Sequence, residues 1–97
     1  MILARDIFQA QFGRGGELAR AIKEGAPQIA QLFGGKVRVL TDLSGQFDTV
    51  VVEMEVDSLA KWEQARREMF TRPDFRQAFE HTGSLIAGGR SEFFNIE

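Results

Sequence analysis

The segment spanning residues 36–56 constrains the fold most, because its second half alternates in polarity. Apolar Val50, Val52, Met54 and Val56 alternate with Thr49, Val51, Glu53 and Glu55. In a strand, a period of two places these sets on opposite faces of a sheet. One face is wholly apolar and needs a permanent cover. Residues 37–43 alternate as well, and Gly45, within the turn Ser44–Gln46, supplies the backbone freedom of a tight hairpin.

Strand-like and helix-like patterns alternate along the rest of the chain. Residues 2–12 and 90–96 have the period of a strand, whereas residues 17–33, 58–70 and 73–87 carry apolar stripes at helical spacing. Pro27 predicts a kink or break near Glu24 in the first helix. Pro73 separates the second helix from the third. The pattern predicts one α+β domain over residues 1–97.

This order of elements favours a ferredoxin-like βαββαβ fold with an extra short helix before the last strand. Its four-stranded antiparallel sheet would carry the helices on one face, against Val50, Val52 and Met54. We expect the first and last strands near the middle of the sheet and the first strand of the hairpin at an edge.

The opposite face of the predicted sheet has no helix left to cover it. It should still carry large apolar side chains, namely Leu3, Ile7, Phe47, Val51 and Phe93. Monomers seldom expose a large contiguous apolar patch, so we expect a second copy to pack there about a two-fold axis. The product would be a homodimeric α/β barrel, with Arg5, Glu53 and Glu55 paired across it or at its rim. The alternative is a monomer with a hydrated open face.

Composition excludes several function classes. The net charge is −2, basic and acidic residues are interspersed, and there is no cysteine. The chain therefore lacks the basic patch of a nucleic-acid-binding protein, a disulfide framework and a thiolate zinc site. Its apolar runs are too short to span a bilayer, and its N-terminus does not resemble a signal peptide. We expect a cytoplasmic protein without a metal site or cofactor.

One motif in the hairpin carries a family resemblance. With L-S-G-x-F-D at residues 43–48, the segment 38–65 resembles the NIPSNAP-like group of dimeric α/β barrel proteins, as do the helix over 73–87 and the closing strand. The resemblance implies a homodimer whose two sheets close a barrel. The wider superfamily includes cofactor-free monooxygenases of aromatic compounds, haem-degrading monooxygenases, isomerases and members without known activity. The fold alone therefore does not specify a reaction.

The resemblance also implies a ligand cleft between helices and sheet. We predict a small apolar or aromatic ligand and a lining that includes Phe8, Val52, Met54, Trp62 and Phe79. The sequence leaves open whether the protein is an enzyme. A cofactor-independent monooxygenase or isomerase would need a group that moves a proton, and the candidates are Arg38, Asp6 and His81.

Each candidate also has a structural interpretation. Trp62 fits core or interface packing, and His81 lies off the inner stripe of its helix. Charges near the hairpin commonly stabilise turns or edge strands, which applies to Arg38, Asp42 and Asp48. Arg5 and Asp6 could form ion pairs with Glu53 or Arg90.

Haem handling is a third, less favoured hypothesis. In haem-degrading relatives a helical His ligates iron, and a Trp and a first-strand Asn shape the pocket. Here the only Asn is Asn95, in the last predicted strand, so the constellation is incomplete.

Overall fold

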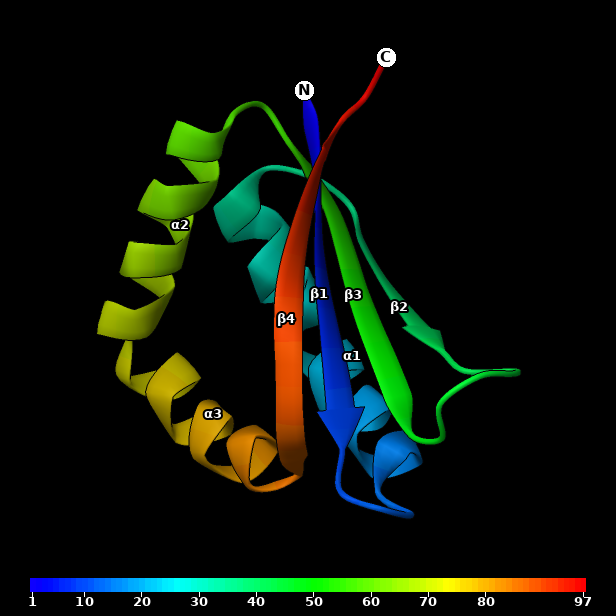
Figure 1. Ribbon diagram of the computed structural model, residues 1–97. Helices are drawn as coiled ribbons and strands as arrows, with labels where there is room; N and C mark the ends of the chain where they lie inside the picture. Colours follow the sequence, from blue (N-terminus) through cyan, green and yellow to red (C-terminus); the bar gives the residue numbers. More distant parts are fainter.

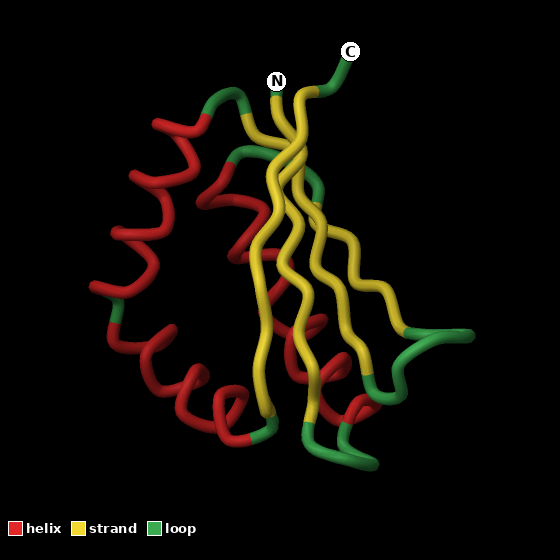
Figure 2. Tube along the Cα trace, viewed as in Figure 1, coloured by secondary structure: helices red, strands yellow, loops and turns green.

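The computed structural model describes residues 1–97 and has the predicted order of elements (Figure 1). The strands are β1 (Ile2–Ala10), β2 (Val37–Thr41), β3 (Thr49–Val56) and β4 (Ile86–Asn95), and the helices are α1 (Gly15–Phe33), α2 (Leu59–Thr71) and α3 (Pro73–Ser84). This is the ferredoxin-like layout with one extra helix. All three helices lie on one side of the sheet, and the two termini emerge at the same end (Figure 2).

The four strands form one antiparallel sheet in the order β2-β3-β1-β4. The prediction that β2 lies at an edge and β1 in the interior is confirmed, whereas the prediction that the last strand lies near the middle is wrong. Each helical crossover joins two parallel strands with a third strand between them. Strands β1 and β3 are therefore central, and β4 forms the second edge.

The apolar row of β3 lies against the helices, as its alternation predicts. Val50, Val52, Met54 and Val56 are at most 5% exposed. Across them pack Leu18 and Ile22 of α1, Ala65 of α2 and Leu85. This core lies mainly between α1 and the two central strands.

Helix α1 differs from the expectation at Pro27, because it runs from Gly15 to Phe33 without a break. Proline removes the hydrogen bond that would reach the carbonyl of Lys23. Both residues are exposed, so water can hydrate that carbonyl while the rest of the helix stays intact. Gly34 ends the helix in the left-handed conformation, at φ 80°.

The hairpin connection is longer than predicted. β2 ends at Thr41 and β3 begins at Thr49, so residues 42–48 form a loop rather than a tight turn at Gly45. Leu43 is fully exposed, and Phe47 is 72% exposed on this loop instead of lying on the sheet. The loop projects from the edge of the sheet (Figure 2).

The predicted end of α3 is also wrong. The helix stops at Ser84, and β4 starts at Ile86, so Gly88 and Gly89 belong to the strand. Gly89 needs its lack of a side chain, because a Cβ there would lie 2.8 Å from the carbonyl oxygen of Ile7. Glycine allows this close approach between two paired strands.

The helix-free face of the sheet carries the apolar side chains that β1 and β3 were expected to place there. Leu3 pairs with Glu55 and Ile7 with Val51 across β1 and β3. The prediction that Phe93 lies on this face is wrong, because Phe93 pairs with Ala4 on the helix side. Its neighbour in sequence, Phe94, lies on the helix-free face, where the guanidinium of Arg5 sits 5.1 Å from its ring centre.

Candidate functional site

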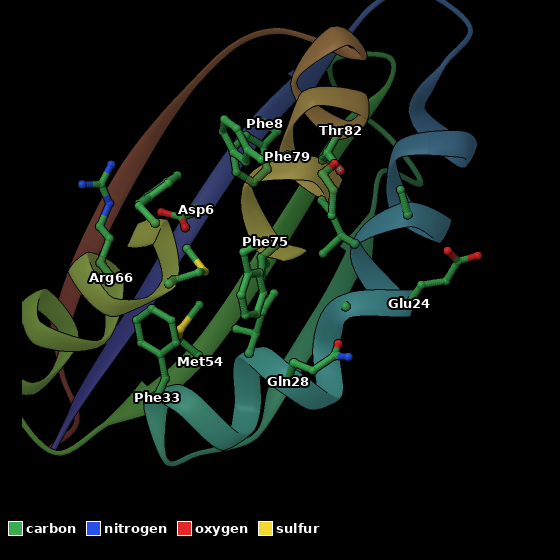
Figure 3. Close-up of a pocket in the computed structure, with 18 of the residues that line it drawn as sticks. Asp6, Phe8, Glu24, Gln28, Phe33, Met54, Arg66, Phe75, Phe79 and Thr82 are labelled. Atoms are coloured by element: carbon green, nitrogen blue, oxygen red, sulfur yellow. Dashed lines mark hydrogen bonds between the residues drawn. The ribbon is translucent and has the colours of Figure 1, made fainter. Parts of the chain in front are cut away.

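A cavity of about 470 Å³ lies between the sheet and the three helices (Figure 3). Its volume is in the range of small-molecule sites. Fourteen of its 22 lining residues are hydrophobic, so the site is mainly apolar. The sheet contributes Asp6, Phe8, Val52, Met54, Ile86 and Ser91; α1 contributes Ala21, Ile22, Glu24, Gly25, Gln28, Ile29 and Phe33; α2 and α3 contribute Trp62, Arg66, Met69, Phe70, Asp74, Phe75, Ala78, Phe79 and Thr82.

The cavity exists because α2 and α3 stand away from the sheet. The chain leaves the helical conformation at Arg72, ahead of Pro73, and the two helices form an arc around the sheet (Figure 1). Helix α2 buries only Ala65, and α3 buries no residue at all. Both helices nevertheless present apolar side chains toward the sheet.

The aromatic rings of these helices are therefore incompletely covered. Phe79 is 49% exposed and Phe70 36%, although both line the cavity and pack edge-to-face at 5.5 Å. Trp62 lies edge-to-face with Phe93 at 4.9 Å. An apolar molecule in the cavity would cover ring surface that the chain leaves open.

The five residues predicted to line a ligand cleft all line this cavity: Phe8, Val52, Met54, Trp62 and Phe79. The alternation of β1 and β3 locates the first three, and the apolar stripes of α2 and α3 locate the others. These five residues form part of the cavity wall, and their role in ligand binding stays a prediction.

Asp6 is the charged group that the sheet contributes to this wall. It pairs with Val52 on one side and with Ser91 on the other, and its side chain points to the helix side among the rings (Figure 3). The hydroxyl of Ser91 donates a 2.6 Å hydrogen bond to Asp6 Oδ1. The sequence did not single out Ser91, because only the register between β1 and β4 brings it to Asp6.

Several solved structures have the same fold. A NIPSNAP domain protein from Burkholderia xenovorans superposes with a TM-score of 0.86 at 15% identity, over 100% of this chain and 95% of that one. A NIPSNAP family protein of unknown function from Agrobacterium tumefaciens superposes with a TM-score of 0.88 at 15% identity, over 97% of this chain and 86% of that one. The chain has the NIPSNAP fold. The resemblance predicted from the hairpin motif is thus confirmed at the level of the fold.

Other structures with this fold carry a different description. A candidate antibiotic biosynthesis monooxygenase from Deinococcus radiodurans superposes with the NIPSNAP fold of this chain at a TM-score of 0.72 and 18% identity, over 100% of this chain and 93% of that one. No protein-family model and no curated protein matches the sequence. At these identities the comparisons establish architecture and leave the function to the site itself.

Of the three candidate catalytic residues, only Asp6 lines the cavity. Arg38 lies on the opposite, helix-free face, where it pairs with Glu53. His81 is 61% exposed on α3, and its Nε2 lies 3.8 Å from a carboxylate oxygen of Glu17. No group of three or more His, Cys, Asp or Glu side chains is placed to hold a metal ion.

Glu53 anchors a charge cluster on the helix-free face. It is 4% exposed, accepts a 2.8 Å hydrogen bond from Arg5 Nε and accepts another from Arg38. Arg38 lowers the pKa of Glu53, burial opposes this effect, and Arg5 lowers the pKa further. Glu92 lies 3.8 Å from Arg5 at the edge of the cluster.

The ion pair between Arg5 and Glu53 that the sequence suggested is confirmed within one chain. Asp6 instead accepts a hydrogen bond from Ser91, and Arg90 lies 3.2 Å from Glu92. The hairpin carboxylates also have local partners. Asp42 Oδ1 accepts a 3.0 Å hydrogen bond from the backbone N–H of Thr49. Asp48 accepts bonds of 2.7 and 3.1 Å from the N–H groups of Gly13 and Gly15, where α1 begins.

None of the three helices combines the length and hydropathy needed to cross a bilayer.

Proposed function

We propose that this protein binds a small apolar or aromatic molecule in the cavity between sheet and helices. One observation carries the proposal: α3 has an apolar face but buries none of its residues, because Phe75, Ala78 and Phe79 face an open cavity. An apolar helix face normally gains its stability by burial against another element. A ligand of suitable size would provide that burial here.

Filling the cavity tests the proposal. Ala78→Phe places a ring in the space, whereas Ala60→Phe adds the same ring to the exposed start of α2, outside the lining. A panel of neutral apolar ligands should change the fluorescence of Trp62, the only tryptophan. We expect Ala78→Phe to abolish the response and Ala60→Phe to keep it. A panel without any response in the unmodified protein would contradict the proposal.

We further propose that the protein acts as a homodimer joined through the helix-free sheet face. Phe94 is 45% and Leu40 39% exposed there, next to Ile7 and Val51. The helices cover only the other face (Figure 2). A second copy of the same sheet would cover this apolar surface symmetrically.

An enzymatic role is the second candidate, because the carboxylate of Asp6, a group able to move a proton, lies among the rings of the apolar cavity. Asp6 could accept a proton from a bound aromatic substrate while Ser91 holds its other oxygen. A cofactor-independent monooxygenase or isomerase could use such a base. Oxygen uptake and isomer formation with a panel of phenolic substrates test this role. Turnover that is unchanged in Asp6→Asn would exclude Asp6 as the base.

The position of His81 does not support haem handling. Its exposed imidazole is outside the cavity lining, so it could not ligate the iron of a haem bound there. A haemin titration that produced a Soret shift in the unmodified protein but not in His81→Ala would overturn this conclusion.

A further inference from the structure

The charged groups that line the cavity are mainly acidic. The lining includes three carboxylates, those of Asp6, Glu24 and Asp74, and one cationic side chain, that of Arg66. Asp74 is already paired with Arg72 at 3.2 Å, whereas Asp6 and Glu24 form no ion pair. The exposed side chains of Glu24 and Arg66 lie at the periphery of the cavity, while Asp6 lies among the rings (Figure 3). This balance of charges favours a positively charged ligand over a negatively charged one.

Arg66 does not neutralise Asp6. Its guanidinium carbon lies 5.6 Å from the ring centre of Trp62 and 5.1 Å from that of Phe70, both on its own helix. Arg66 forms no ion pair with a carboxylate, and Asp6 forms none with a cationic side chain. A bound cation would therefore not have to displace a protein cation from Asp6.

Asp6 has one oxygen available. Ser91 donates to Oδ1, and no protein group donates a hydrogen bond to Oδ2. Asp6 is half-buried, so a donor bound there would be partly screened from water, which strengthens a charged hydrogen bond.

The neighbouring rings suit the same kind of ligand. Phe8 follows Asp6 by two residues on the same face of β1, and Phe75 and Phe79 approach from α3 (Figure 3). Aromatic rings cover hydrocarbon, and their faces attract ammonium groups. A carboxylate set among phenylalanine rings therefore offers one contact for an ammonium group and another for hydrocarbon.

We propose that the cavity selects lipophilic amines. The ammonium group donates to Asp6 Oδ2, and the aryl or alkyl body lies among Phe8, Phe75 and Phe79. This inference rests on the proposed ligand-binding function and adds the chemical class of the ligand.

Calorimetric titration with three matched probes at neutral pH tests the inference. The probes are 4-phenylbutylamine, 4-phenylbutan-1-ol and 4-phenylbutanoate, which share one body and differ in their polar group. We expect the amine to bind about tenfold more tightly than the alcohol, because only the ammonium group adds an opposite charge to its hydrogen bond with the Asp6 carboxylate, and the anion to bind most weakly. Asp6→Asn should remove the preference for the amine over the alcohol, and retained binding of the alcohol shows that the variant is folded.

Asp57→Asn is the matched control, because it removes one negative charge from an exposed residue outside the cavity lining. It should keep the preference for the amine. Equal binding of amine and alcohol, or an amine preference that survives Asp6→Asn, would overturn this inference and leave the apolar binding site in place. If none of the three probes binds, the proposed function fails as well.

Discussion

Removing both arginines around Glu53 should cost more stability than the two single losses together. The side chain of Arg38 is 69% exposed, so we expect Arg38→Ala to lower the free energy of unfolding by about 1 kcal/mol. Arg5 is 34% exposed and donates through Nε, so Arg5→Ala should cost about 2 kcal/mol. Each single variant still leaves Glu53 one arginine partner.

The double variant leaves a carboxylate that is 4% exposed without either donor. Breaking a buried pair costs about 3–5 kcal/mol, and losing both donors at so buried a carboxylate should fall at the upper end, about 4–5 kcal/mol. The combined loss should therefore exceed the sum of the single losses, about 3 kcal/mol, by about 1–2 kcal/mol. Denaturant unfolding followed by circular dichroism, at one protein concentration for all variants, measures these losses. Strictly additive losses would refute the shared role of the two arginines.

The pH dependence of the same variants gives a second measurement. In the unmodified protein the pKa of Glu53 is lower than in the unfolded chain. Its contribution is therefore complete above the unfolded value of about 4.3 and is lost as the pH falls through the folded value. In the double variant burial alone should raise the pKa of Glu53, so stability should decrease as the pH rises from about 4 to 7. An equal increase in stability with pH in the unmodified protein and in the double variant would contradict this account.

Three further changes test the fold and the proposed dimer. Gly35→Ala would place a Cβ 2.1 Å from the carbonyl oxygen of Glu55, so we expect the free energy of unfolding to fall by more than about 2 kcal/mol in denaturant. Gly88→Ala is the control, because its Cβ meets nothing within 4 Å and the change should be nearly neutral. Equal effects of the two changes would contradict the close approach at Gly35. Asp48→Ala removes both hydrogen bonds at the start of α1, so the free energy of unfolding should fall by about 1–2 kcal/mol and the melting temperature should fall with it. An unchanged melting temperature would show that these bonds contribute little. Ile7→Glu adds a charge to the helix-free sheet face, so sedimentation should show monomers of the variant and dimers of the unmodified protein; a monomeric unmodified protein would remove the proposed dimer.

The sequence predicted most of the fold because its strongest patterns belong to buried elements. The period of two in β3 reports a face that is covered along its whole length, so Val50 to Val56 could be placed correctly. The position of β4 could not be read in the same way. Edge and centre differ in their partners rather than in their own alternation, and β4 carries glycines that resemble a helix stop.

The candidate site was partly predictable for the same reason. Residues that line the cavity lie on regular faces, so alternation and helical spacing located Phe8, Met54 and Trp62. Ser91 was missed because its role depends on the register between two strands 85 residues apart. The patterns of the helices also could not show that α3 stands off the sheet and leaves a cavity, because packing distance is a property of the tertiary structure.

The methionine methyl groups report on the cavity with a control inside the same molecule. Met54 and Met69 line the cavity, whereas Met1, the only other methionine, does not and is 61% exposed. In a titration of ¹³C-methyl-methionine-labelled protein with 4-phenylbutylamine, ring currents should shift the Met54 and Met69 signals until the site is saturated, while Met1 stays unchanged. Methyl signals that do not move, or that all move together without saturation, would contradict a binding site between the sheet and α3.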